Sequence, residues 1–282
     1  MKRKYYYPLI ACCILAIQVS GLCADNPEQL IAAHLESIGS ADALSQIKSI
    51  TLVGALVPEF NQGSIYANQG STYTTSGVAM LVSEGTKIGI VISPGGNASQ
   101  TWEHFAYDGK DVTTRDISYR TKTLMSDFIH NYDWIMKNGL LGGVYSRGWP
   151  FLDAKGDSSN MRELRKTKVD GDELYEFEYR PADRYVGMTI NLYFDPETYR
   201  HVRTQYRSSL FILTEKFDDF RKVDGVSLTL PHNYTLEHSA AINSRIYVTT
   251  WNIDILAWEF NEPEINQDIF NGKKYTNQES GR

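Results

Sequence analysis

The sequence predicts a mainly β fold with some helices, built on one large, curved antiparallel sheet, and two observations support this. Runs of alternating bulky and polar residues recur along the chain, and several end at a turn dipeptide such as Asp195-Pro196 or Asp224-Gly225. Side chains of a strand alternate between its two faces, and these dipeptides supply the backbone angles of tight turns. Consecutive strands joined by short turns form a meander, which twists and curls as it grows. A large curved sheet has a concave side.

The first 24 residues have the pattern of a leader. Residues 2–4 are basic, residues 9–19 are apolar apart from Gln18, and small residues precede Asp25. This pattern predicts a signal peptide, residues 1–24, that is cleaved before Asp25 on export to the periplasm. A short membrane anchor is the alternative, but a bilayer needs about 20 consecutive apolar residues and Gln18 and Ser20 interrupt this run.

All three cysteines, Cys12, Cys13 and Cys23, lie inside the predicted leader. The cleaved chain would contain no cysteine and could form no disulfide. Cys12 also follows a short sequence that resembles a bacterial lipoprotein signal, so lipid anchoring through Cys12 is an alternative to a free N-terminus. Too little apolar sequence precedes Cys12 for this, and we expect the unanchored form.

Length and charge limit the classes of function. Removing 24 residues from 282 leaves residues 25–282, a length that fits one sheet-rich domain. The formal net charge is −6 and the sequence pI is near 5.6. Affinity for nucleic acid comes mainly from clustered Lys and Arg, so we expect no nucleic-acid partner.

The chain opens with a predicted helix and then changes to strands. Asp25 or Asn26 can cap a helix that begins at Pro27 and ends at Gly39, and Ser40 can cap a second short helix. The apolar stripe of the first helix is Leu30, Ile31, His34, Leu35 and Ile38. Strands are predicted at residues 50–57, 71–83, 87–93, 101–107, 164–169, 173–180, 187–194, 199–206, 211–220, 227–237 and 245–256.

The one long interruption of the strand pattern is residues 121–143, where the period is helical. Residues on one arc of about 140° are apolar, namely Leu124, Met125, Phe128, Ile129, Tyr132, Ile135 and Met136. This predicts a helix over residues 121–138 that covers an apolar surface. The glycines at 139, 142 and 143 allow a hinge or lid, and an ordinary core helix with a glycine stop is the alternative. Trp134 projects away from the apolar arc, and it is either a surface contact or a residue packed under a loop.

Hairpin signatures concentrate in residues 190–270. They are Phe194-Asp195-Pro196-Glu197-Thr198, Phe217-Asp218-Asp219-Phe220, Val223-Asp224-Gly225, Leu230-Pro231 and a terminal stretch from Asn261-Glu262-Pro263 to Phe270. With the opening amphipathic helix and the mid-chain helix, this order resembles the LolA-like periplasmic outer-membrane lipoprotein carriers and the outer-membrane lipoprotein-sorting proteins. The resemblance implies an unclosed antiparallel half-barrel, covered on its concave face by helices around an apolar cavity for acyl chains. An extra segment at residues 137–160 leaves the cargo open.

A lipid site of this kind needs apolar lining and a polar rim. Each buried methylene contributes about 0.8 kcal/mol, and Leu, Ile, Met and Phe adapt to a flexible chain. Candidate lining residues are Leu124, Phe128, Ile135 and Met136 from the helix and Met80, Val82, Ile90 and Ile92 from strands, although each also fits an ordinary core. Candidate rim residues are Arg115, Arg120, Arg147 and Trp149, because guanidinium groups bind phosphate; solvated arginines and a packed loop are the alternatives.

Enzymatic functions lack their motifs in this sequence. There is no His-Glu-x-x-His, no Gly-x-Ser-x-Gly and no Gly-rich phosphate loop, so we expect no catalytic residue, no metal and no cofactor. The turn at Asp195 is interpreted as scaffold. Two functions are consistent with the pattern: a carrier whose partners are lipid or lipoprotein acyl chains, and a periplasmic envelope sensor or protein-interaction module with the same fold. Exchange of lipid between vesicles distinguishes the carrier from the sensor.

Overall fold

The computed structural model describes residues 24, 26–64, 67–74, 76–94, 103–116, 124–152, 160–181, 187–242 and 245–272. The predicted signal peptide, with Cys12, Cys13 and Cys23, lies outside these residues except for Ala24. Within the described ranges, no helix is both long enough and apolar enough to cross a membrane.

The two N-terminal helices form as predicted. Helix α1 (Pro27–Ile38) begins after Asn26, whose side chain accepts a hydrogen bond from the first turn at 2.9 Å, and ends at Gly39. The side chain of Ser40 caps α2 (Ala41–Gln46) in the same way at 3.2 Å. All five residues of the predicted stripe of α1 are buried: Leu30, Ile31, His34, Leu35 and Ile38. This amphipathic face therefore fixes α1 on the end of the sheet.

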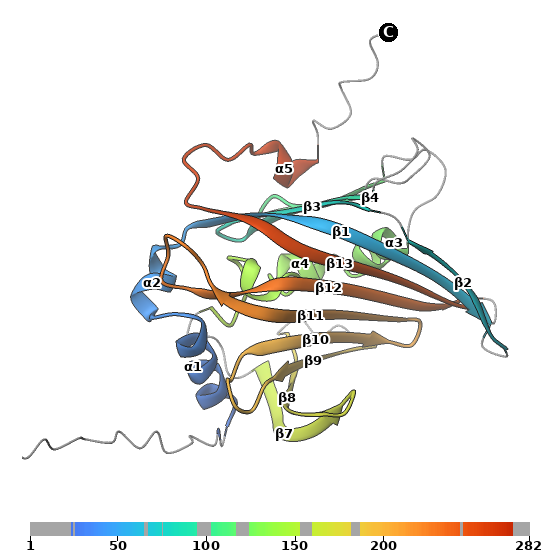
Figure 1. Ribbon diagram of the computed structural model, residues 1–282, viewed down its shortest axis with the longest axis horizontal. Helices are drawn as coiled ribbons and strands as arrows, with labels where there is room; N and C mark the ends of the chain where they lie inside the picture. The colour runs from blue at the N-terminus through green and yellow to red at the C-terminus, as the bar shows by residue number, and fades with distance from the viewer. Residues whose placement is uncertain are drawn as a thin grey trace, which may run out of the picture.

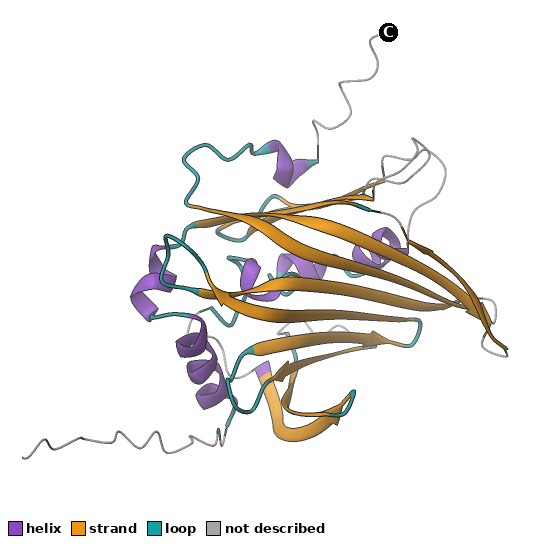
Figure 2. Ribbon diagram, in the orientation of Figure 1, coloured by secondary structure: helices purple, strands orange, loops and turns teal. Residues whose placement is uncertain are grey.

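Most of the described chain is strand (Figure 2). The first group is β1 (Ser49–Ser64), β2 (Ala67–Thr74), β3 (Gly77–Glu84), β4 (Lys87–Pro94), β5 (Glu103–Tyr107) and β6 (Val112–Asp116). The second group is β7 (Met161–Val169), β8 (Asp172–Tyr179), β9 (Met188–Phe194), β10 (His201–Ser208), β11 (Phe211–Lys222), β12 (Thr229–Ile242) and β13 (Arg245–Phe260). The single strand predicted at 71–83 is two strands, because β2 and β3 pair with different parts of β1.

These strands form one antiparallel sheet of 13 strands, which confirms the predicted fold class. Its order is β6-β5-β4-β3-β1-β13-β12-β11-β10-β9-β8-β7, and β2 pairs with β1 off this path. The first and last long strands, β1 and β13, therefore lie side by side at its centre (Figure 1). Among the described pairings, β6 and β7 at the two ends do not meet, so the curved sheet stays unclosed.

The helical segment between β6 and β7 covers the concave side, but not as the one helix that was predicted. It consists of α3 (Leu124–Asn131), α4 (Trp134–Lys137) and the short 3-10 turn η1 (Gly143–Tyr145). The helix is interrupted at residues 132–133. In α4, which follows, Trp134 is buried together with Ile135 and Met136 of the predicted arc, so the core surrounds this short helix on more than one side. Helix α3 packs against β5, β6 and β12, so it lies inside the curve of the sheet.

Helix α5 (Asp268–Asn271) covers part of the opposite, convex face. Its Ile269 and Phe270 pack with Val82 and Val91 in a small hydrophobic cluster, separate from the main core. Gly89 allows α5 to lie this close to β4, because a Cβ at this position would be 2.5 Å from the carbonyl oxygen of Ile269. The large core lies on the concave side, between the sheet and α1, α3, α4 and η1.

Candidate functional site

The concave face of β10, β11 and β12 carries the polar groups of the interior. In β11, Leu213, Glu215 and Phe217 share a face by strand alternation, and all three are buried. Alternation therefore places one carboxyl group inside an apolar core. A buried carboxyl group needs hydrogen-bond partners, and the contacts of Glu215 define the first part of the site.

Glu215 connects the sheet to the segment that crosses it. Its Oε1 accepts hydrogen bonds from the backbone N–H of Gly142 at 2.7 Å and from the hydroxyl of Tyr234 at 2.5 Å. Its Oε2 lies 2.8 Å from the hydroxyl of Tyr206, which also lies 2.8 Å from the carbonyl oxygen of Leu140. Gly142 has a φ of 87°, a left-handed conformation that suits glycine and directs its N–H at the carboxyl group.

Burial raises the pKa of Glu215 to about 7, although the hydrogen bonds from Tyr234, Gly142 and Tyr206 oppose this shift. The proton matters for geometry, because the Tyr206 hydroxyl has one hydrogen and two neighbouring acceptors. A protonated Glu215 donates to Tyr206, which then donates to the Leu140 carbonyl, so both contacts are satisfied. An ionised Glu215 has no proton to donate and accepts the hydrogen bond from the Tyr206 hydroxyl. The Leu140 carbonyl oxygen then loses this donor.

Further hydrogen bonds fix the same segment, which we call the anchored segment, residues 139–149. The Tyr145 hydroxyl donates to the carbonyl oxygen of Pro231 at 3.0 Å. The backbone N–H of Arg147 donates to Ser83 Oγ at 2.7 Å, and its guanidinium donates to the carbonyl oxygen of Leu44 at 3.3 Å. The anchored segment is thus bonded to β3, β10, β11, β12 and α2.

The contacts under α3 are of a different kind. Phe128 is fully buried, and its ring packs against Tyr132, Tyr206, Phe211 and His238 with centroid separations of 5.1, 6.5, 6.3 and 5.5 Å. Tyr132 also contacts Phe211 at 6.4 Å. We call these five residues the α3 ring cluster. It joins α3 to β10, β11 and β12 through apolar surface.

His238 is the polar member of this cluster. It is fully buried, and within the described part of the chain neither of its ring nitrogens has a hydrogen-bond partner. Burial lowers its pKa to about 4, so the imidazole is neutral at pH 7. The ring stacks on Phe211 at an interplanar angle of 29°. A neutral imidazole there can still donate or accept one hydrogen bond.

A second aromatic group, around His34 and His201, joins α1 to the sheet. The backbone N–H of His201 lies 3.2 Å from His34 Nδ1, and burial lowers the pKa of His34 to about 3. Trp149 packs between them, with ring centroids 5.4 Å from His34 and 5.0 Å from His201. Trp149 is buried within this group, which fits the packed loop given as the alternative to a rim position.

The predicted lining residues lie on both faces of the sheet. Phe128, Ile135, Met136, Ile90 and Ile92 are buried in the main core on the concave side. Met80 and Val82 pack in the convex cluster under α5, so their assignment to the concave lining is wrong. The strand register gives the reason. Ile90 faces the concave side and its cross-strand partner is Leu81, so Leu81 faces the same side. Met80 and Val82 are each one residue from Leu81 and therefore face the opposite side. The side chain of Leu124 lies outside the described part.

The predicted rim residues do not come together as a described site. Arg147 is half-buried and belongs to the anchored segment. Arg120 lies outside the described residues, and Arg115 is placed only through its backbone pairing with His104 in β5. No described contact joins these arginines.

Sequence reasoning assigns no role in the site to the two most informative polar residues of the interior, Glu215 and His238. A signal for each was present. Glu215 stands between Leu213 and Phe217 at a spacing of two, and His238 stands two residues after Leu236 in β12. A charged or polar residue in phase with apolar neighbours faces the core.

Comparison with known proteins finds structural neighbours only. No protein-family profile matches the chain, and no curated protein matches it. A LolA superfamily protein from Nitrosomonas europaea matches at 12% identity and a TM-score of 0.41, over 88% of this chain and 98% of that chain. An outer membrane lipoprotein-sorting protein domain from Vibrio parahaemolyticus matches at 12% identity and a TM-score of 0.35, over 86% and 98%.

A third neighbour is a DUF1329 family protein from Desulfovibrio piger, at 12% identity and a TM-score of 0.36, over 87% of this chain and 97% of that chain. At this identity no site residue carries over from them to this chain.

Proposed function

We propose that this protein is an exported carrier that shelters the acyl chain of a lipid or lipoprotein between the concave face of its sheet and helix α3. The observation that carries the proposal is the difference in how the cover is held. The anchored segment is fixed by hydrogen bonds to Glu215 and to four other elements, whereas the ring contacts described here between α3 and the sheet are those of the α3 ring cluster.

An acyl chain can replace ring contacts at little cost. A flexible methylene chain offers the same dispersion and hydrophobic contacts to Phe128 and Phe211 that these rings make with each other. Replacing the hydrogen bonds of the anchored segment would instead leave buried donors and acceptors unpaired. Entry of cargo under α3 is therefore the route that keeps the rest of the core intact.

Cargo release requires that the open and covered states differ by only a few kcal/mol. Helix α3 meets this requirement because it is short, with eight residues, and because the helix is interrupted at residues 132–133, before the anchored segment begins. The proposal predicts that α3 moves away from β11 and β12 when cargo enters, while the sheet stays in place.

A reversible cross-link across the ring cluster tests this. Tyr132→Cys and Phe211→Cys would be introduced into a chain with Cys12, Cys13 and Cys23 replaced by serine, and joined with a thiol-cleavable bis-maleimide. The two rings are 6.4 Å apart, so a short linker holds α3 on β11. We expect the unlinked double variant to bind a fluorescent polyene fatty acid, the linked form to lose this binding, and reductant to restore it.

The single-cysteine variants serve as the control. Each one, treated with the same reagent, should keep its fatty-acid binding, because its label does not bridge α3 and β11.

A second experiment examines the natural cargo. Lipid extracted from protein purified from its native envelope and identified by mass spectrometry should contain acyl chains. Equal binding by the linked and unlinked forms would rule out entry under α3. Absence of both extracted lipid and fatty-acid binding would overturn the carrier function and favour the protein-interaction module.

A further inference from the structure

Three exposed apolar side chains stand at the tips of neighbouring hairpins. Leu210, in the turn between β10 and β11, is 59% exposed, and Ile242 and Ile246, beside the turn between β12 and β13, are 39% and 41% exposed. Strands β1, β2, β12 and β13 converge at this end, at the lower right of Figure 1. We call it the hairpin end. Apolar side chains that are exposed together at neighbouring strand tips, rather than scattered singly, mark a contact surface.

The tips are fixed relative to one another. Ser208 Oγ accepts hydrogen bonds from the backbone N–H groups of Leu210 at 3.3 Å and Phe211 at 3.0 Å, which holds the turn. The carbonyl oxygen of Leu210 accepts from the N–H of Ala241 at 3.4 Å, and Ala241 pairs with Ile246. Leu210 and Ile246 therefore lie in one row across two hairpins and form a continuous apolar edge.

The hairpin end is also free of negative charge. Residues 60–83, 205–214 and 238–253, which supply its strands, contain no Asp or Glu, although the whole chain has a net charge of −6. Arg207 and Arg245 stand exposed beside the apolar tips, and neither takes part in an ion pair within the described residues. The combination is apolar tips with uncompensated positive charge.

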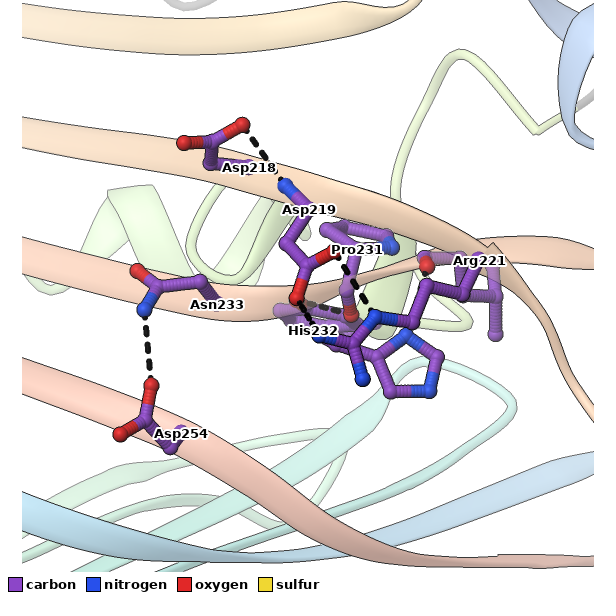
Figure 3. Close-up of polar contacts among 9 residues, drawn as sticks. Asp218, Asp219, Arg221, Pro231, His232, Asn233 and Asp254 are labelled. Atoms are coloured by element: carbon purple, nitrogen blue, oxygen red, sulfur yellow. Dashed lines mark hydrogen bonds and ion pairs between the residues drawn. The ribbon is translucent and has the colours of Figure 1, made fainter.

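The opposite part of the sheet differs in its acidic residues. On β11 and β13, Asp218, Asp219 and Asp254 lie close together, with Arg221 and Asn233 bonded to two of them (Figure 3). The turns at that end of the sheet add Glu84, Asp108, Asp111, Asp195, Glu197 and Asp224. Acidic side chains thus concentrate at these turns, whereas residues 60–83, 205–214 and 238–253 carry none, so an anionic partner would approach the molecule at the hairpin end.

We propose that the hairpin end docks on an anionic lipid surface, with Leu210, Ile242 and Ile246 inserted between head groups and Arg207 and Arg245 on lipid phosphates. Apolar side chains that enter the interface, together with cations that face anionic lipid, are the two contributions that hold peripheral proteins on membranes. Phe211 of the α3 ring cluster follows Leu210 directly, so docking brings that cluster to the lipid surface. The docking proposal stands independently of the proposed cargo.

Flotation with lipid vesicles tests the docking. The wild-type protein should bind vesicles of phosphatidylcholine mixed with phosphatidylglycerol, and high salt should weaken this binding because it screens the arginines. Replacing Arg207 and Arg245 together with glutamine should weaken affinity about thirtyfold, at about 1 kcal/mol for each cation. Replacing Leu210 and Ile246 together with serine should weaken it on the order of tenfold.

Matched controls lie elsewhere on the surface. Leu256→Ser removes an apolar side chain that is 71% exposed but lies beside Asp254 in β13, and Lys110→Gln removes a cation whose side chain is 87% exposed in the β5–β6 turn. Both controls should bind vesicles like the wild type. All variants change exposed positions, so their melting temperatures should match that of the wild type.

Three outcomes would overturn the docking proposal. The first is equal binding to neutral and anionic vesicles, and the second is an equal loss of binding in the controls. The third is vesicle-free self-association that the serine variant abolishes, because the hairpin end would then be an interface between copies. Fatty-acid binding in solution should be unchanged in the hairpin variants, which separates a failure of docking from a failure of the proposed cargo function.

Discussion

The two parts of the concave cover, the anchored segment and α3, contact the same sheet but are held by different forces. The anchored segment is bonded through Glu215, Tyr145 and Arg147 to groups with defined geometry. Helix α3 rests on rings, with the unpaired imidazole of His238 beneath it. Buried hydrogen bonds fix one arrangement of the groups they join, whereas aromatic rings can pack in several arrangements. The cover therefore combines a fixed part, the anchored segment, with α3, whose ring contacts an acyl chain can replace.

The strongest test of this comparison is a buried charge in each part. Leu141→Asp in the anchored segment should lower the free energy of unfolding by about 3–5 kcal/mol, because Leu141 is buried in the main core and an unpaired carboxylate has no water to reach there. Phe128→Asp in α3 should cost less, since α3 can lift and expose the new charge. Urea unfolding followed by circular dichroism measures both, and fatty-acid binding should be lost in the α3 variant. Equal destabilisation would show that both parts belong to one rigid core.

The sheet could be predicted from the sequence because its signals are local. Alternation and turn dipeptides such as Asp195-Pro196 are contained within a few residues, and so are the caps of α1 and α2. The interior of the site depends on register. Met80 and Val82 were placed on the wrong face because nothing local to β3 says which of its two apolar faces meets the core.

The cover was harder still to predict. Helix α4 buries Trp134 as well as Ile135 and Met136, and a one-sided apolar period cannot indicate that a short helix is surrounded by core. The contact between Glu215 and Gly142 joins residues 73 positions apart in the sequence, and only the fold brings them together.

The two parts should also respond to pH in opposite directions. Glu215 has a folded pKa of about 7 against an ordinary 4.5, so the folded protein holds its proton more tightly and loses stability as pH rises from 4.5 to 7. His238 has a folded pKa of about 4 against 6.5, so the unfolded chain takes the proton first and stability is lost as pH falls from 6.5 to 4.

Variants separate these contributions. Relative to the wild type, Glu215→Gln should gain about 2–3 kcal/mol as pH rises through its window, and His238→Phe should gain about as much as pH falls through its own. His34 has the same sign as His238 but is present in every protein compared, so it cancels in the differences. Denaturant titrations between pH 4 and 8 measure these slopes. If the free energy of unfolding changed with pH in the same way for the wild type and Glu215→Gln, the pKa of Glu215 would not be raised by folding. The carboxyl group would then lie in a more polar setting than its contacts indicate.

The smallest expected effect comes from a turn outside both parts, which serves as the baseline for the comparison. Asp195 Oδ1 accepts hydrogen bonds from the backbone N–H groups of Glu197 at 3.1 Å and Thr198 at 2.7 Å, so it holds the β9–β10 turn as the sequence predicts. Asp195→Ala should lower the free energy of unfolding by about 0.5–2 kcal/mol, as the loss of a side-chain cap does. Thermal unfolding measures this, and fatty-acid affinity should stay at the wild-type value. A variant that kept its melting temperature but lost binding would make this turn functional, and the division of roles would then extend beyond the concave cover.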